Sequence, residues 1–224
     1  MNGLEMAPVR AVSLDFSGTL VSPDLMDYFW LELVPLLYSK KQGIWLSEAK
    51  DEVYAAYEDV GKDELRWYLP SYWFERFGIS EMMGQAIADA QAKMKVYPDV
   101  SSLRALEGKY RLVICSNMTE DFLRSFAPKL GIGEEGYFSA VSGFALTTKR
   151  KEFYSRVAEA LKIDPSELVH VGDDVQADFQ APREAGWNAI LLDRQRHHPD
   201  VSPCITNLSS LPTMIERLAA EATA

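Results

Sequence analysis

Apolar and polar positions along the chain predict short strands that alternate with helices, except in one long helical stretch. The first strand covers residues 9–14, stops at Asp15 and is followed by the turn-forming run Ser17-Gly18-Thr19. Later apolar runs predict strands at 111–115, 137–141, 168–171 and 188–192. Helical periodicity predicts helices at 101–107, 119–130, 151–162, 176–185 and 212–220. Such alternation favours an α/β fold, in which a parallel sheet is covered by helices on both faces.

Residues 22–97 interrupt this alternation and are helical in character throughout. Leu25, Phe29 and Leu33 recur at helical spacing, and further helices are predicted at 47–60, 63–78 and 80–95. The sequence therefore predicts two domains. Residues 1–21 and 98–224 form the α/β core, and residues 22–97 form an all-helical insertion that leaves and returns just after the first strand.

Aromatic residues are concentrated in the helical insertion. The chain has 10 Phe, 10 Tyr and 5 Trp, and fourteen of these 25 lie between Ser22 and Pro98. A small helical block needs large side chains to bury enough apolar area, so most of them are predicted to be core. A few between Trp67 and Phe77 are expected to face a functional site and exclude water from it.

Charge and composition exclude several classes of function. Acids outnumber bases 33 to 23, which gives a formal charge of −10. A field of that sign disfavours binding to nucleic acid and to anionic membrane surfaces. The two cysteines, Cys115 and Cys204, make neither a disulfide framework nor a zinc site, and no run approaches the ~20 apolar residues of a membrane span. We expect a cytoplasmic globular protein; the sequence carries no signal for an oligomeric state.

Polar residues follow several predicted strands at the point where each strand ends. The set is Asp15, Ser17 and Thr19; Ser116 and Asn117; Asp173, Asp174 and Asp178; and Lys149, Arg150 and Lys151 before a helix. Ligands of open parallel sheets bind beyond the carboxyl ends of the strands, so these groups are expected to converge. Crowded carboxylates repel one another unless a cation neutralises them, and Mg²⁺ prefers oxygen ligands and substrate phosphate. The residues therefore predict a magnesium-assisted site for a small phosphorylated metabolite.

The same segments resemble the motifs of the haloacid dehalogenase superfamily of hydrolases. The quoted stretches are VSLDFSGTL around Asp15, VICSN around Ser116, the lysine at 149, HVGDDVQAD around Asp173 and APREAG after it, with YPDV at 97–100 as a further familiar element. The resemblance covers the core, about two thirds of the chain, and implies a Rossmann-like α/β fold. Residues 22–97 match in position and helical character, as a cap inserted between the first and second motifs.

The resemblance implies a phosphatase-like site. Asp15 would be the nucleophile that forms an aspartyl-phosphate. Mg²⁺ would be bound by the carboxylates of Asp15 and Asp173 and by the backbone carbonyl of Ser17. Asp178 and Asp174 complete the candidate metal site by orienting those ligands.

The remaining candidate residues would contact the phosphate or the rest of the substrate. Ser116 would hydrogen-bond a phosphoryl oxygen, and Lys149 would balance the charge on Asp15 and the phosphate. Lys151 is the rival for that role, because the spacing to the next helix is one residue shorter than the family pattern. Thr19, Asn117 and Lys151 are the candidate substrate-binding residues.

Ser17 departs from the phosphatase pattern, in which a second aspartate two residues after the nucleophile protonates the leaving alcohol. A hydroxyl is a poor general acid, and losing such a group typically costs ~10²–10⁴-fold in rate. Three readings follow: a weak phosphatase or one that uses good leaving groups such as acyl phosphates, a phosphonate hydrolase, or a catalytically degenerate binding or regulatory protein. A phosphonate hydrolase would need a cap lysine for a Schiff base, with Lys40, Lys41 and Lys62 as candidates. The phosphatase reading comes first because every other motif is present.

Overall fold

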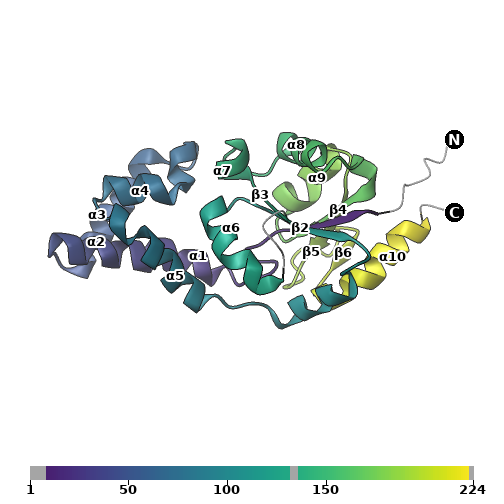
Figure 1. Cartoon of the computed structure of the whole chain (residues 1–224), viewed down its shortest axis with the longest axis horizontal. Helices are drawn as coiled ribbons and strands as arrows, with labels where there is room; N and C mark the ends of the chain where they lie inside the picture. The colour runs from purple at the N-terminus through teal and green to yellow at the C-terminus, as the bar shows by residue number, and fades with distance from the viewer. Residues whose placement is uncertain (1–8, 132–135, 222–224) are drawn as a thin grey trace.

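A six-stranded parallel sheet forms the centre of the computed structural model, which describes residues 9–131 and 136–221 (Figure 1). The strands are β1 (Ala11–Leu14), β2 (Arg111–Ser116), β3 (Tyr137–Ser139), β4 (Leu168–Gly172), β5 (Asn188–Leu192) and β6 (Cys204–Ile205). Their order across the sheet is β3-β2-β1-β4-β5-β6, and every neighbouring pair is parallel. The predicted α/β class with a parallel sheet is confirmed.

The order of the strands reverses at β1, which lies between β2 and β4. Leu14, the last residue of β1, is in register with Ile114 of β2 and Val171 of β4. The loops that follow these three strands therefore leave the same edge of the sheet side by side. In open α/β sheets this switch point is where ligands bind.

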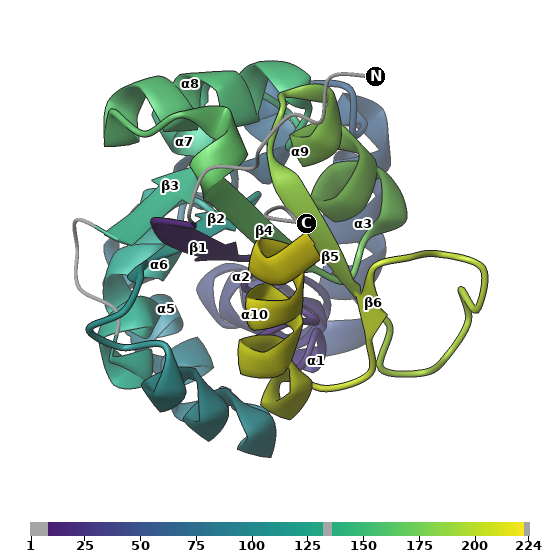
Figure 2. The ribbon, with the colours of Figure 1, turned by 90° about the vertical axis from the view of Figure 1, so that its right-hand side faces the viewer.

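Side-chain alternation along the strands sends apolar residues to both faces of the sheet. Val12 and Leu14 belong to one buried cluster with Phe122, whereas Ala11 belongs to a second cluster with Phe153. Helices cover both faces: α8 and α9 lie on one side and α10 on the other (Figure 2). The helices that follow the strands are α6 (Glu120–Phe126), α7 (Ala140–Phe144), α8 (Lys151–Leu161), α9 (Ala181–Glu184) and α10 (Leu211–Glu221).

The helices between residues 22 and 97 form a separate lobe, drawn at the left of Figure 1. They are α1 (Asp24–Asp27), a π-helical stretch (Tyr28–Leu33), α2 (Val34–Gln42), α3 (Leu46–Val60), a 3₁₀ turn (Leu65–Tyr68), α4 (Pro70–Arg76), a 3₁₀ turn (Ser80–Met82) and α5 (Met83–Lys93). The chain enters and leaves this lobe side by side: Ser22 N donates to Lys95 O at 2.9 Å and Tyr97 N to Leu20 O at 3.0 Å. We refer to it below as the helical lobe.

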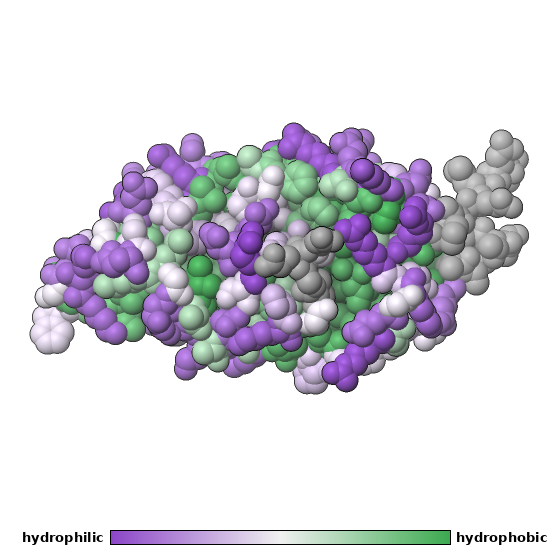
Figure 3. Space-filling view, viewed as in Figure 1, coloured by the Kyte–Doolittle hydropathy of each residue, from purple (hydrophilic) through white to green (hydrophobic). Residues whose placement is uncertain are grey.

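Aromatic packing joins the helical lobe to the sheet-bearing part. The ring of Phe29 meets that of Phe122 on α6 edge to face, with centroids 4.8 Å apart, and stacks near Phe74 of α4. Such pairs add ~0.5–1.5 kcal/mol beyond the area that they bury. On the face drawn in Figure 3, hydrophilic residues are spread over both lobes, and hydrophobic residues show among them on each lobe.

Several predicted elements differ in detail from the structure, and the helix predicted at 101–107 is a 3₁₀ stretch over Pro98–Ala105. The predicted helix 63–78 is divided, because Pro70 starts α4 and holds Leu69 before it in an extended conformation. The predicted strand 137–141 ends at Ser139, whose hydroxyl accepts a hydrogen bond from Ser142 N and so caps α7. The predicted helix 176–185 begins as a π-helical stretch over Val175–Gln180.

Strand β6 is only two residues long and was not predicted, since it pairs at the sheet edge without an apolar run. The remaining short turns are 3₁₀, at Pro98–Ala105, Ala127–Leu130, Pro165–Glu167 and Leu208–Ser210. Across the described ranges 9–131 and 136–221, no helix combines the length and the apolar character of a membrane span.

Candidate active site

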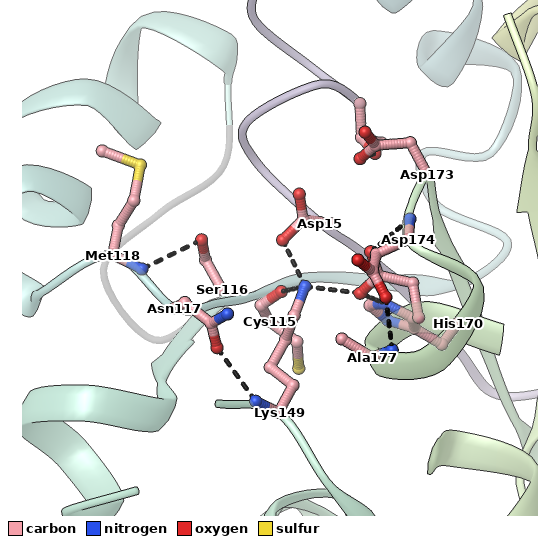
Figure 4. Close-up of polar contacts among 12 residues, drawn as sticks. Asp15, Cys115, Ser116, Asn117, Met118, Lys149, His170, Asp173, Asp174 and Ala177 are labelled. Carbon is pink, nitrogen blue, oxygen red and sulfur yellow. Dashed lines mark hydrogen bonds and ion pairs between the residues drawn. The ribbon is translucent and has the colours of Figure 1, made fainter. Parts of the chain in front are cut away.

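Polar residues from three strand ends converge beyond the carboxyl edge of the sheet (Figure 4). Asp15 follows β1, Ser116 ends β2, and Asp173 follows β4. The nitrogen of Asp15 donates to Val171 O at 2.9 Å, which continues the strand pairing one residue beyond β1 and fixes the start of the loop. The polar segments that follow these three strands therefore lie close together, as the sequence predicts.

Lys149 lies at the centre of this group and is almost completely buried. Its ammonium contacts a carboxylate oxygen of Asp15 and one of Asp178, the latter at 2.5 Å, and donates to Cys115 O at 3.2 Å. Burial lowers the pKa of Lys149, but the two carboxylates raise it more, so the pKa is above its usual value and the group stays charged. Lys151, its rival in the sequence, is exposed on the first turn of α8 and does not line the site.

Asp178 is a buried carboxylate with partners on both oxygens. Oδ1 faces His170 Nε2 at 3.0 Å as well as Lys149, and Oδ2 accepts from Asp174 N at 3.1 Å. Burial alone would raise the pKa of Asp178, but the Lys149 ammonium and His170 outweigh it and hold that pKa well below its usual range. A Cβ at Gly172 would lie 2.4 Å from the carboxyl carbon of Asp178, so only glycine lets this carboxylate approach.

His170 continues this network into the sheet. Its Nδ1 lies 2.9 Å from Ser13 Oγ, and its ring packs edge to face on Tyr154, whose hydroxyl donates to Ala177 O at 2.7 Å. Burial lowers the pKa of His170, so the neutral ring is favoured. His170 is fully buried within β4, and it also holds Asp178 in place. Eight residues separate the two in sequence, and only the strand–loop–helix path shows that they meet.

Asp173 stands at the more open end of the site and is held by the loop after β1. Thr19 Oγ1 donates to Asp173 Oδ1 at 3.2 Å. Thr19, predicted as a substrate-binding residue, is fully buried and is not among the residues that line the cavity; its hydroxyl donates to a carboxylate. Gly18, with φ of +87°, lets the loop pass against Asp173, because a Cβ there would be 2.2 Å from Oδ2.

The side chains of Asp174 and Asn117 both accept hydrogen bonds from backbone nitrogens of the protein. One carboxylate oxygen of Asp174 accepts from the backbone nitrogens of Gln176 and Ala177 at 2.8 and 2.7 Å, which caps the helical stretch that follows. The side-chain oxygen of Asn117 accepts from Lys149 N at 2.9 Å and so positions the lysine. Both residues line the cavity, but the structure does not bring Asp174 into the carboxylate cluster described next.

Three carboxylates form a cluster that could hold a metal ion. Oxygens of Asp15, Asp173 and Asp178 all lie within 4.8 Å of one another, and hard oxygen donors of this kind suit a divalent cation. The pKa of Asp15 is raised to about 7, because burial and the charges of Asp178 and Asp173 together outweigh the lowering by the Lys149 ammonium. Burial and then Asp178 also raise the pKa of Asp173. One ammonium does not neutralise three carboxylates, so a bound cation would stabilise their ionised forms.

A cavity of about 1050 Å³ opens from these carboxylates towards the helical lobe. On the sheet side it is lined by Asp15, Ser17, Ser116, Asn117, Lys149 and Asp173. Opposite them lie residues of the helical lobe, including Trp67 and Tyr68, as expected for the stretch between Trp67 and Phe77. Of the three lysines considered for a Schiff base, Lys62 lines the cavity, whereas Lys41 pairs with Glu81 at 2.7 Å on the surface.

Ser17 and Ser116 face this cavity with hydroxyl groups that can still donate. Ser116 Oγ accepts from Met118 N at 3.2 Å, which leaves its proton free. Ser17 is half-buried, and nothing in its side chain can act as a carboxylic acid. The Thr119 hydroxyl, also at the cavity wall, is buried without a partner among the described residues.

The switch-point position, the buried lysine and the acidic cluster together define a candidate hydrolase site. The chain belongs to the haloacid dehalogenase-like hydrolase family, whose model matches residues 9–186. It is 33% identical to the GMP/IMP nucleotidase YrfG of Escherichia coli (strain K12) over 189 residues, which is 82% of each chain. It is 28% identical to Enolase-phosphatase E1 of Hydrogenobaculum sp. (strain Y04AAS1), covering 66% of this chain and 62% of that protein.

Solved structures support the same fold at lower identity. A HAD phosphatase from Thermococcus onnurineus superimposes with a TM-score of 0.72 at 21% identity, over 92% of this chain and 98% of that one. A 2-haloacid dehalogenase from Pseudomonas syringae pv. Tomato DC3000 gives a TM-score of 0.65 at 18% identity, over 94% and 100%. One fold thus carries different reactions, and the reaction has to be argued from the site.

Proposed function

We propose that this protein is a Mg²⁺-dependent phosphatase of nucleoside monophosphates that works through an aspartyl-phosphate at Asp15. The observation that carries the proposal is the contact of the buried Lys149 ammonium with both Asp15 and Asp178, beside Asp173. A buried cation next to a carboxylate nucleophile suits a reaction that brings a phosphate dianion to that carboxylate. The similarity to a GMP/IMP nucleotidase supports the substrate class.

In the first step, a carboxylate oxygen of Asp15 attacks phosphorus, and the bond from phosphorus to the ester oxygen breaks. Lys149 and the Ser116 hydroxyl donate to the phosphoryl oxygens, whose charge shifts during the transfer. In the second step, water attacks the phosphorus, the Asp15 carboxylate leaves, and inorganic phosphate forms. The carboxylates of Asp15, Asp173 and Asp178 and the carbonyl of Ser17 would hold Mg²⁺, which would supply charge neutralisation.

Proton transfer to the leaving alcohol is the weak point of this site. Ser17 stands where a general acid would act, so the alkoxide takes its proton from water. We therefore propose slow turnover of nucleoside monophosphates and faster turnover of esters with good leaving groups. Residues 22–97 are proposed to act as the cap over the site, because their aromatic residues form the far wall of the cavity.

The test is phosphate release from nucleoside monophosphates with and without Mg²⁺, for the wild type and for Asp15→Asn. Glu107→Gln, which changes an exposed carboxylate outside the cavity, is the matched control. We expect activity that requires Mg²⁺, is lost in Asp15→Asn and is retained in Glu107→Gln. Equal rates in the wild type and Asp15→Asn would remove Asp15 as the nucleophile.

The second candidate is a binding protein of the same fold without turnover, favoured by Ser17 alone. Such a protein would trap a phosphate analogue at Asp15 but release no phosphate. Treatment with beryllium and fluoride, followed by measurement of bound beryllium, separates the two. Stoichiometric binding that needs Asp15, with no phosphate release from any ester, would establish the binding protein.

A further inference from the structure

The wall of the cavity opposite the carboxylates carries several aromatic rings, and the polar atoms of three of them are hydrogen-bonded to the backbone. Trp67 Nε1 donates to Tyr57 O at 3.1 Å, and Trp73 Nε1 donates to Trp67 O at 2.8 Å. The Tyr57 hydroxyl donates to Trp30 O at 3.2 Å. These bonds fix the rings to the backbone of the helical lobe. Trp67 and Trp73 therefore offer a ligand their ring faces and edges rather than indole N–H donors.

Two charged side chains in the same wall form no hydrogen bond or ion pair with the described residues. Asp27, on α1, is exposed and makes no side-chain hydrogen bond or ion pair with any described residue. Lys62 has no ion pair among the described residues either, and its Nζ lies 5.5 Å from the centre of the Trp67 ring. The unpaired ammonium lies over the held indole ring, and the unpaired carboxylate lines the same cavity, so the packing uses neither charge. They are, however, suitable groups for recognising a ligand.

We propose that Trp67, Lys62 and Asp27 form the subsite that binds a 6-oxopurine base, an inference that rests on the proposed phosphatase function. A planar base stacked on an aromatic side chain gains ~1–3 kcal/mol. Lys62 donates a hydrogen bond to an acceptor on the base, where O6 and N7 both serve. Asp27 accepts from the N1–H of the base, and in guanine also from the 2-amino group.

The carboxylate makes this subsite selective between purines. A 6-oxopurine carries a proton on N1, so it donates to Asp27. Adenine has a lone pair at N1 and an amino group at position 6, so it would place a lone pair against the carboxylate and a donor against Lys62. Unpaired polar groups in a binding site lower affinity more than lost apolar contacts do. Guanosine and inosine monophosphates should therefore bind more tightly than adenosine monophosphate.

Binding rather than turnover tests this subsite, so the result does not depend on the catalytic weakness at Ser17. Calorimetry with Asp15→Asn and Mg²⁺ would compare GMP, AMP and ribose 5-phosphate. We expect GMP to bind at least tenfold more tightly than the other two. In that background Asp27→Asn should weaken GMP about tenfold and leave ribose 5-phosphate within twofold, and Trp67→Ala should weaken both nucleotides by about tenfold.

Matched controls use residues of the same lobe outside the cavity. Asp24→Asn on α1 and Trp45→Ala, whose side chain is 82% exposed, should leave all three affinities unchanged. Lys62→Met should weaken GMP, whereas Lys40→Met should not. Because Asp27 is exposed and Asn has the same shape, Asp27→Asn keeps the test valid even if Trp67→Ala fails to fold.

The outcomes separate this inference from the proposed function. GMP that binds no better than ribose 5-phosphate, or an Asp27→Asn variant that weakens every ligand equally, overturns the subsite even in an active phosphatase. Selective GMP binding without phosphate release from the wild type keeps the subsite and overturns the phosphatase. Uniform loss in the controls as well would also count against a role specific to these three residues.

Discussion

Arg194 and Asp99 form a two-pronged ion pair, with Nη1–Oδ2 and Nη2–Oδ1 distances of 2.8 and 3.1 Å. The same guanidinium donates to Thr19 O at 2.8 Å and to Gly18 O at 3.3 Å, and it lies 3.9 Å over the ring of Tyr97. One side chain thus joins the loop after β1 to the segment that returns from the helical lobe. Arg194 is a positioning residue for the loop that carries Ser17.

Asp99→Asn should lower stability at neutral pH by about 1 kcal/mol, a modest figure because solvent partly screens the pair. Burial raises the pKa of Asp99, but hydrogen bonds from Arg194 and from Leu208 N lower it more, so the folded pKa lies below 3.8. A lowered folded pKa gives stability above the unfolded pKa, and that stability is lost as the pH falls through the folded value.

Urea unfolding of the wild type and Asp99→Asn between pH 7 and pH 3 checks this sign. The difference in unfolding free energy should be largest at pH 7 and shrink below about pH 4. Asp200→Asn, at an exposed carboxylate, is the control, and its unfolding free energy should equal that of the wild type at every pH. A gap that stays constant down to pH 3 would mean that the ionised pair is not its source.

Gly18→Ala should damage the site beyond its effect on the backbone. Gly18 has φ of +87° and its added Cβ would lie 2.2 Å from Asp173, whereas Gly43 has φ of +70° and nothing within 4 Å. Both alanines cost ~1–2 kcal/mol of strain. Only Gly18→Ala displaces a carboxylate of the acidic cluster, so its Mg²⁺-dependent activity should fall at least tenfold.

Thermal unfolding and Mg²⁺ titration of the two glycine variants provide the comparison. Similar melting temperatures with an Mg²⁺ requirement raised only in Gly18→Ala are expected. If Gly43→Ala raised the Mg²⁺ requirement to the same extent, general strain rather than the contact with Asp173 would explain the loss.

Lys149→Met should reduce phosphate release by about 10²–10³-fold, the usual effect of losing a group that stabilises transition-state charge. It also leaves Asp15 and Asp178 without their shared cation. Lys151→Met removes an exposed ammonium two residues away and should stay within twofold of the wild type. Initial rates of both variants at saturating Mg²⁺ show which lysine the reaction needs. A larger loss in Lys151→Met than in Lys149→Met would make Lys151 the functional lysine.

Much of the fold and site follows from local sequence. A strand that ends in a polar turn is recognisable wherever apolar residues stop at Asp15 or Asp173, and parallel order then brings their ends together. What sequence does not contain is the direction of a side chain within such a loop. Thr19 was therefore expected to face substrate, although its hydroxyl contacts Asp173. His170 likewise reads as an apolar strand residue until the helix that carries Asp178 folds back on it.

The helical lobe shows the same limit on what the sequence can predict about side-chain positions. Its aromatic content indicates a packed helical block, but periodicity cannot separate Trp67 and Trp73, which line the cavity, from the exposed Trp45. Their positions depend on how α3 and α4 pack, which is a tertiary property. Asp27 gave no signal at all, because one acid on a helix is ordinary until the cavity beside it is known.

Ser17→Asp should raise turnover, with a gain that depends on the leaving group. Ser17 lines the cavity beside Asp15, where a carboxylic acid could give a proton to the departing alkoxide. A nucleoside monophosphate leaves as a poor, strongly basic alkoxide, so its hydrolysis should gain at least tenfold. A p-nitrophenyl ester leaves as a stable phenolate and needs no proton, so its hydrolysis should gain little. Ser209→Asp, at an exposed position, is the control for added charge. Equal gains on both substrates would indicate altered binding, and no gain on either would mean that the serine is not a simple deficit in this site.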